Sequence, residues 1–144
     1  MFRKGMIDRI KESVSRLRPK LQQWRRHLHA HPELSYAEHA TAAHVADALS
    51  EAGIPSRTVA GTGLVAELIG ESGPGDRTIA LRADLDALPI HESNSCTYRS
   101  VNEGVMHACG HDAHTAMVLG VALVLHELRT EWSGRVQLVF QPGE

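Results

Sequence analysis

Met106-His107-Ala108-Cys109-Gly110-His111-Asp112-Ala113-His114 is the stretch around which the rest of the chain is organised. It contains three histidines, one cysteine and one aspartate, whose side chains bind transition metals through nitrogen, sulfur and oxygen. His107, Cys109 and His111 alternate, so in an extended segment their side chains would point to one side and converge. Gly110 allows a tight backbone turn between the two best ligand candidates. The stretch therefore predicts a metal site.

A helix is predicted directly after this stretch, over residues 113–130. Its apolar residues recur at steps of three and four: Met117, Val118, Val121, Leu125 and Leu128. Asp112 stands at the position expected for the N-cap. Because this helix is apolar on most sides, it should be buried against a sheet. The candidate metal site thus lies on a loop that enters a buried helix.

The histidines and cysteines also allow other interpretations. A zinc finger is excluded because no second Cys/His pair follows at finger spacing. A nucleophilic pair, with Cys109 attacking and His111 as its base, remains the alternative to metal binding. His29 and His31 are expected to act at a helix end, offsetting exposed carbonyls, rather than as ligands.

Length, charge and hydropathy bound the function. The 144 residues suit one domain, and 15 basic against 17 acidic residues give a net charge of −2. This balance predicts neither nucleic acid nor an anionic membrane surface as a partner. No apolar run reaches membrane-spanning length, and the first residues lack the apolar core of a signal peptide. A cysteine thiolate ligand favours a reducing compartment, so the cytoplasm is expected.

The first half of the chain is expected to begin with two helices. An amphipathic pattern predicts a helix over residues 6–31, which Pro19 should kink or interrupt. A second helix is predicted over residues 35–52. There Ser35 would act as the N-cap and Glu38, three residues later, would complete a capping box.

Strands are expected to alternate with the helices, at residues 56–60, 64–69, 78–85 and 136–140. Arg82, Asp84 and Asp86 fall on one face near the carboxyl end of the third strand. Ligands in open α/β sheets bind outside such ends, so the two acids are candidates for holding a metal or orienting a ligating histidine. The alternative is a solvated strand end with Arg82 pairing one carboxylate. Glu144 follows the last strand at another carboxyl end.

Several motifs together resemble a known family. They are Arg26-His27-Leu28-His29, Pro32-Glu33-Leu34, Ala80 to Pro89, Met106 to His114, and Gln141-Pro142-Gly143-Glu144. From about Leu21 to Glu144 the chain resembles the amidohydrolase branch of the two-metal aminoacylase and carboxypeptidase family. That branch includes hippurate hydrolases, N-acyl-amino-acid amidohydrolases and plant auxin-conjugate hydrolases.

The resemblance implies roles for individual residues. Cys109 and His111 would be metal ligands, Asp86 the acid that orients the metal site, and Glu144 the general base. Asp84 occupies the place where other branches carry a ligand histidine, and its role stays open because the cysteine compensates in this branch. The implied fold is a zinc-exopeptidase-like α/β/α sandwich with a mixed sheet.

The resemblance also implies that residues 1–144 are the N-terminal portion of a catalytic domain. A second glutamate ligand would follow Glu144 directly, and two more histidine ligands and a dimerisation and lid domain would lie further along. We therefore expect two divalent ions (zinc, manganese, cobalt or nickel), an N-acyl amino acid or short peptide as substrate, and homo-oligomeric full-length relatives. The alternative is a truncated metal-binding fragment without activity.

Overall fold

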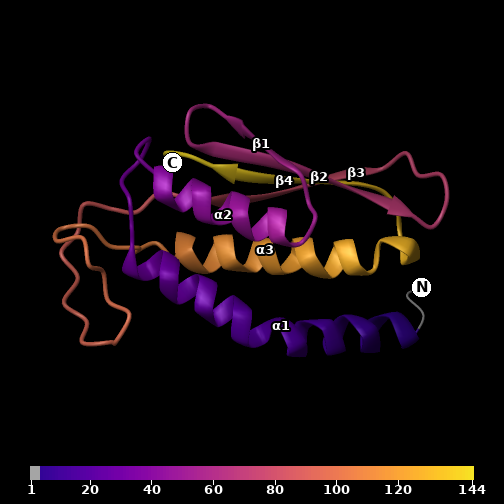
Figure 1. The fold of residues 1–144 in the computed structure, drawn as a ribbon, viewed down its shortest axis with the longest axis horizontal. Helices are drawn as coiled ribbons and strands as arrows, with labels where there is room; N and C mark the ends of the chain where they lie inside the picture. The colour runs from indigo at the N-terminus through magenta and orange to yellow at the C-terminus, as the bar shows by residue number, and fades with distance from the viewer. Residues whose placement is uncertain (1–3) are drawn as a thin grey trace.

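A four-stranded sheet with helices packed on one face makes up residues 4–144, the part of the chain that the computed structural model describes (Figure 1). The elements in chain order are α1 (Lys4–Ala30), α2 (His39–Glu51), β1 (Ser56–Val59), β2 (Gly63–Glu71), β3 (Thr78–Asp84), α3 (His111–Glu127), the 3₁₀ turn η1 (Arg129–Glu131) and β4 (Ser133–Gln141). The mixed α/β fold class predicted from the sequence is confirmed.

The sheet brings two strand ends together. Its order is β1-β2-β4-β3; β1 and β2 pair antiparallel, as do β2 and β4, whereas β3 and β4 run parallel. Asp84, the last residue of β3, lies opposite Gln141, the last residue of β4. The residues that follow these strands, Asp86 and Glu144, therefore emerge at the same edge of the sheet.

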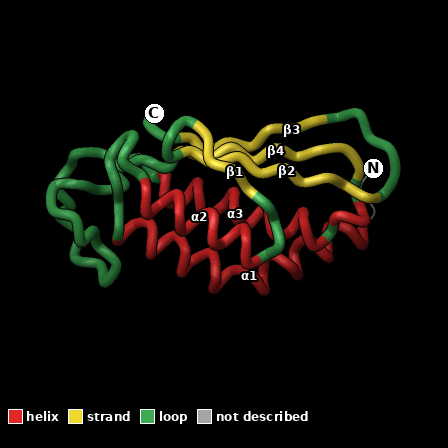
Figure 2. Tube along the Cα trace, turned by 45° about the horizontal axis from the view of Figure 1, so that its top comes forward, coloured by secondary structure: helices red, strands yellow, loops and turns green. Residues whose placement is uncertain are grey.

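The helices form two layers beneath the sheet (Figure 2). α2 and α3 pack on the sheet, and α1 packs on the outer side of α3. α1 packs tightly on α3 at Gly120, because a Cβ there would lie 2.8 Å from a methyl group of Leu21. In residues 4–144 the helices cover one face of the sheet, whereas a complete α/β/α sandwich has helices on both faces. Ile69, on the other face, is 56% exposed.

The helix boundaries test the predictions made for Pro19 and for Asp112. α1 is not interrupted at Pro19, which lies inside it. The hydrogen bond lost at Pro19 is outweighed because the following turns bury Trp24 and Leu28 in the core. The residue at the N-cap of α3 is Gly110, with φ 86°, and Asp112 lies inside the first turn, where it is buried.

The predicted capping box at the start of α2 is wrong. Ser35 lies outside the helix, and its hydroxyl donates to Asp86 instead. The carboxylate of Glu33 caps α2, accepting from the amides of Ala40 at 3.1 Å and Thr41 at 2.7 Å. Glu38 is the boundary residue, and its side chain turns away from the helix end. The side chains of Ser35 and Glu38 therefore bond to groups outside α2 and do not cap its first turn.

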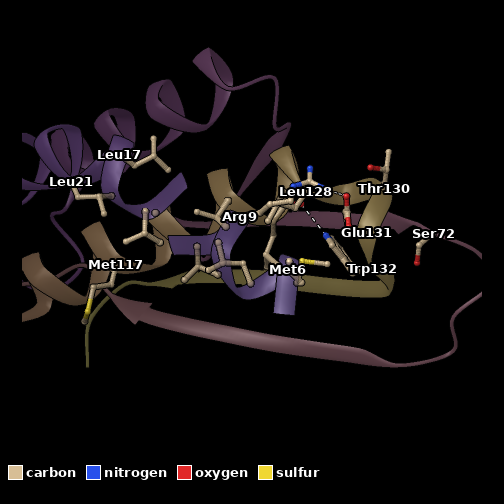
Figure 3. Close-up of a pocket in the computed structure, with 17 residues that line it drawn as sticks. Met6, Arg9, Leu17, Leu21, Ser72, Met117, Leu128, Thr130, Glu131 and Trp132 are labelled. Atoms are coloured by element: carbon tan, nitrogen blue, oxygen red, sulfur yellow. Dashed lines mark hydrogen bonds and ion pairs between the residues drawn. The ribbon is translucent and has the colours of Figure 1, made fainter. Parts of the chain in front are cut away.

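An apolar groove of about 1120 Å³ lies between α1, from Gly5 to Leu21, and the outer face of α3 (Figure 3). Its lining includes Ile10, Leu17, Leu21, Met117, Val121 and Leu128. An ion pair between Arg9 and Glu131 lies at its rim, and the indole N–H of Trp132 donates to the carbonyl of Leu125 at 2.9 Å. Among residues 4–144 no helix combines the length and the apolar character needed to cross a membrane.

Candidate metal centre

Cys109, His111 and Glu144 form a cluster of potential metal ligands at the carboxyl end of the sheet. One thiol sulfur, one ring nitrogen and one carboxylate oxygen from these residues lie within 4.8 Å of one another. His111 is buried at the start of α3, whereas Cys109 and Glu144 are exposed. The left-handed conformation of Gly110 turns the chain between Cys109 and His111, as the sequence predicted.

The ring of His111 is oriented by Asp86. Its Nδ1 lies 2.8 Å from the backbone carbonyl oxygen of Asp86 and 3.2 Å from its Oδ1. Its Nε2 lies 3.1 Å from Oε2 of Glu144. With Nδ1–H donated to Asp86, the lone pair of Nε2 is directed toward the cluster, which is the arrangement typical of a ligating histidine.

Asp86 also connects two further segments to the site. Its Oδ2 accepts from the Ser35 hydroxyl at 2.7 Å and from the backbone N–H of Glu144 at 3.3 Å. The neighbouring acid behaves differently, because Arg82 donates twice to Asp84 Oδ1, at 2.9 and 2.7 Å. The two acids predicted at this strand end are thus separated: Asp86 faces the cluster, and Asp84 is paired with an exposed arginine.

A buried polar network lies behind the cluster and involves His29. Its Nδ1 is 2.7 Å from Asp112 Oδ2 and its Nε2 is 3.0 Å from Glu92 Oε1, and Arg25 adds an ion pair to Asp112 at 2.9 Å. His29 is therefore more than the helix-end residue that the sequence predicted. Burial alone would raise the pKa of Glu92, but hydrogen bonds, first from Ser100 N–H and then from His29, lower this pKa to about 2.

His107 does not join the cluster, contrary to the predicted convergence of alternate side chains. It is buried, and neither ring nitrogen has a hydrogen-bond partner among residues 4–144. Its pKa is lowered to about 4, mainly because burial disfavours the imidazolium; repulsion from His29 and His111 adds to this against the attraction of Asp112. The chain around His107 is not an extended strand, which removes the assumed alternation.

The donors present fit a transition metal. A thiolate, an imidazole and a carboxylate suit zinc, cobalt or nickel better than magnesium or calcium. Asp86 Oδ1 and Asp112 Oδ1 are buried without a hydrogen-bond partner among the described residues. Because buried polar atoms are normally hydrogen-bonded, packing alone does not account for these two oxygens. The number of clustered donor atoms, three, equals the number of protein ligands typical of one catalytic zinc site.

Sequence reasoning missed several residues that support this site. The sequence patterns yielded no prediction for Glu92, while Ser35 and Glu38 were expected to cap a helix and His29 to act at a helix end. The contacts of His29 with Asp112 span 83 positions, so no local pattern reports them. The His-x-x-Pro-Glu-Leu-Ser segment within the family resemblance was the available signal.

Comparisons with known proteins show which proteins the chain resembles. A model of peptidase family M20/M25/M40 matches residues 80–144. The N-acyl-L-amino acid amidohydrolase of Geobacillus stearothermophilus is 46% identical over 138 residues, covering 95% of this chain and 37% of that protein. The N-acetyl-L-cysteine deacetylase of Bacillus subtilis is 48% identical, covering 92% of this chain and 32% of that protein.

A solved structure gives the same result for the fold. The Bacillus subtilis YXEP protein, described as a dinuclear metal-binding peptidase from the M20 family, superposes with a TM-score of 0.83 at 44% identity. The match covers 90% of this chain and 36% of that one. The chain thus spans about a third of the length of the relatives it matches. Over residues 80–144 the chain matches peptidase family M20/M25/M40, and the named relatives and the solved structure are similar to it over most of its length.

Proposed function

We propose that this chain supplies part of the active site of a metal-dependent amidohydrolase that cleaves the amide bond of N-acyl amino acids or short peptides. The observation that carries the proposal is the cluster of Cys109, His111 and Glu144, with the ring of His111 fixed by Asp86. The relatives named as an N-acyl-L-amino acid amidohydrolase and an N-acetyl-L-cysteine deacetylase support the substrate class.

Cys109 and His111 would hold metal, within a site for two divalent ions. The dinuclear description of the related YXEP protein supports that number. Zinc, manganese, cobalt or nickel would each be compatible with the donors, the thiolate being least suited to manganese. Divalent ions bound there would supply Lewis acidity toward the amide carbonyl and lower the pKa of a water molecule.

Glu144 would act as the general base. Its carboxylate, 55% exposed, is open to a water molecule and lies beside His111 Nε2. It would accept a proton from that water and pass it to the departing amine nitrogen, a role that requires a carboxylate within hydrogen-bond reach of both atoms. Asp86 would keep the His111 ring in place through its backbone carbonyl and Oδ1. Each role belongs to a residue already oriented by the fold.

The test is hydrolysis of hippurate and N-acetyl amino acids by the protein isolated from its source, together with its mass and metal content. We expect chelator-sensitive turnover that falls about 10²- to 10⁴-fold in Glu144→Gln, the range for loss of a general base. Retained metal in this variant would identify Glu144 as the base, whereas lost metal would identify it as a ligand. Turnover that is insensitive to chelators and abolished by alkylation of Cys109 would overturn the proposal in favour of a cysteine nucleophile.

A second candidate is a metal-binding fragment without activity. It is favoured by the donor count, because the described residues bring three potential ligands together. The expected result for the isolated 144-residue chain is metal binding without useful hydrolysis, since three clustered donors do not complete a two-metal site. Chelator-sensitive turnover by the isolated chain that disappears in Glu144→Gln would contradict this expectation.

The setting of the proposed enzyme follows from its composition. The exposed Cys109 thiol, as a metal ligand, needs a reducing compartment, which supports the cytoplasm. The near-balanced charge of −2 supports a small-molecule substrate rather than nucleic acid or membrane. Homo-oligomerisation is proposed for the longer family members only.

A further inference from the structure

The carboxylate of Glu38 is completely buried, although it lies outside the candidate metal centre. Charged side chains are almost never fully buried unless they are hydrogen-bonded. Glu38 Oε1 accepts from the backbone N–H groups of Tyr36 and Gly143, each at 2.9 Å. Its Oε2 accepts from the Thr62 hydroxyl at 2.5 Å. All three bonds come from segments other than the helix that Glu38 precedes.

One of these bonds reaches the residue next to the candidate base. Gly143 and Glu144 are consecutive, and their two backbone N–H groups are held by two different buried carboxylates, Glu38 at 2.9 Å and Asp86 at 3.3 Å. Such charge-assisted bonds are shorter and stronger than neutral ones. The turn that carries Glu144 is therefore held from two sides.

The surrounding geometry indicates that the loop before α2 is shaped for this contact. Tyr36 has φ 62°, a left-handed conformation that is uncommon for a residue with a side chain, and its amide donates to Glu38 in that conformation. A Cβ placed on Gly143 would lie 2.6 Å from the Tyr36 ring, so the ring packs closely over the turn. Gly143 itself has φ 54°, which favours glycine.

We propose that Glu38 is a positioning residue whose buried carboxylate holds the Gly143-Glu144 turn so that the Glu144 carboxylate lies beside His111 and Cys109. The catalytic meaning of that position rests on the proposed function, but the holding of the turn does not. The competing explanation is that Glu38 stabilises only the packing of α2 against the β1–β2 turn through Thr62.

Three variants separate these explanations. Glu38→Ala removes all three bonds. Thr62→Val removes only the bond to Oε2 and is the matched control, because the bond to Gly143 remains. Glu38→Gln is the conservative variant: its amide oxygen can accept from both backbone N–H groups, and its NH₂ can donate to the Thr62 oxygen.

The first measurement uses NMR to monitor amide hydrogen exchange at Gly143 in the metal-free chain. The Gly143 amide should be protected in the parent chain. Glu38→Ala should raise its exchange rate about ten- to a hundredfold, as expected for loss of a bond to a charged acceptor. Glu38→Gln should stay close to the parent, and Thr62→Val should leave Gly143 protected.

Three outcomes would overturn the proposal: an unprotected Gly143 amide in the parent chain, unchanged exchange in Glu38→Ala, or equal increases in Glu38→Ala and Thr62→Val. The parent measurement decides the matter even if Glu38→Ala fails to fold. In the protein isolated from its source, Glu38→Ala should lower kcat and leave KM nearly unchanged. Glu38→Gln should restore kcat. If Glu38→Ala raises exchange selectively at Gly143 but no form of the protein shows turnover, the proposed function is refuted and the positioning role of Glu38 stands.

Discussion

Different kinds of interaction stabilise the two ends of the molecule. At the end formed by the strand termini and the 85–110 loop, buried charged groups contact one another: His29 with Asp112 and Glu92, and Asp86 with His111. At the opposite end, α1 and α3 meet across an apolar groove (Figure 3). Figure 1 shows the loops and the C-terminus at one end and the N-terminus at the other.

This contrast separates function from stability. Hydrogen-bonded buried charges fix side-chain orientation but cost desolvation, so they serve a site better than they serve stability. Apolar packing stabilises in proportion to buried area and has no preferred direction. Changes at the polar end should therefore alter metal binding, and changes at the apolar end should alter unfolding.

The largest effect is expected from Cys109→Ser at the polar end. A serine hydroxyl is a poor substitute for a thiolate, so affinity for Zn²⁺ or Co²⁺ should fall by more than about a hundredfold, beyond the range seen for residues that only orient ligands. Isothermal titration of the purified chain measures this. Cys96→Ser is the control, and equal affinities in parent and Cys109→Ser would refute the ligand assignment.

Leu119→Ala tests the apolar side of the comparison. Leu119 is fully buried in α3, and its truncation should lower the free energy of unfolding by about 2–5 kcal/mol through lost burial and a cavity. Met117, on the same helix but 56% exposed in the groove, provides the control: Met117→Ala should change stability by about 0.5 kcal/mol or less. Urea unfolding measures both. A change of metal affinity in folded Leu119→Ala would break the separation of the two ends.

Asp86→Asn and Asp84→Asn form a matched pair at one strand end. Asp86 contacts His111, whereas Asp84 pairs with exposed Arg82. Asp86→Asn should lower metal affinity about ten- to a hundredfold with the fold retained, because it weakens the orientation of the ligand. Asp84→Asn should leave affinity nearly unchanged. If only thermal stability falls in Asp86→Asn, the site role of Asp86 is wrong.

The smallest effect concerns pH and Glu92. Its pKa is about 2 in the folded chain against an ordinary value of 4.5, so the unfolded state binds a proton first as pH falls. The stabilisation is therefore complete above about pH 4.5 and is lost between about 4.5 and 2. Glu92→Gln should flatten the fall in urea midpoint over this window, while Glu103→Gln, an exposed change in the same loop, should not. Parallel curves for parent and Glu92→Gln would contradict the expectation.

Local patterns predicted much of the fold because they report local forces. The three- and four-residue apolar steps located α1 and α3, and alternation located the strands within a few residues. The interruption considered at Pro19 does not occur, because tertiary packing outweighs one missing hydrogen bond in a helix of 27 residues. The capping pattern at Ser35 and Glu38 misled for a related reason: both side chains found partners far along the chain.

By itself, the sequence determined which donor types are available and where they lie along the chain, since thiolate, imidazole and carboxylate chemistry belongs to the residues. Only the tertiary structure decided which of them meet. The parallel pairing of β3 with β4 places Asp86 and Glu144 at one edge, so Glu144 joins the cluster, whereas His107 lies outside it. Glu38 and Gly143 are in contact although they lie 105 positions apart, and no short-range periodicity can encode such a contact.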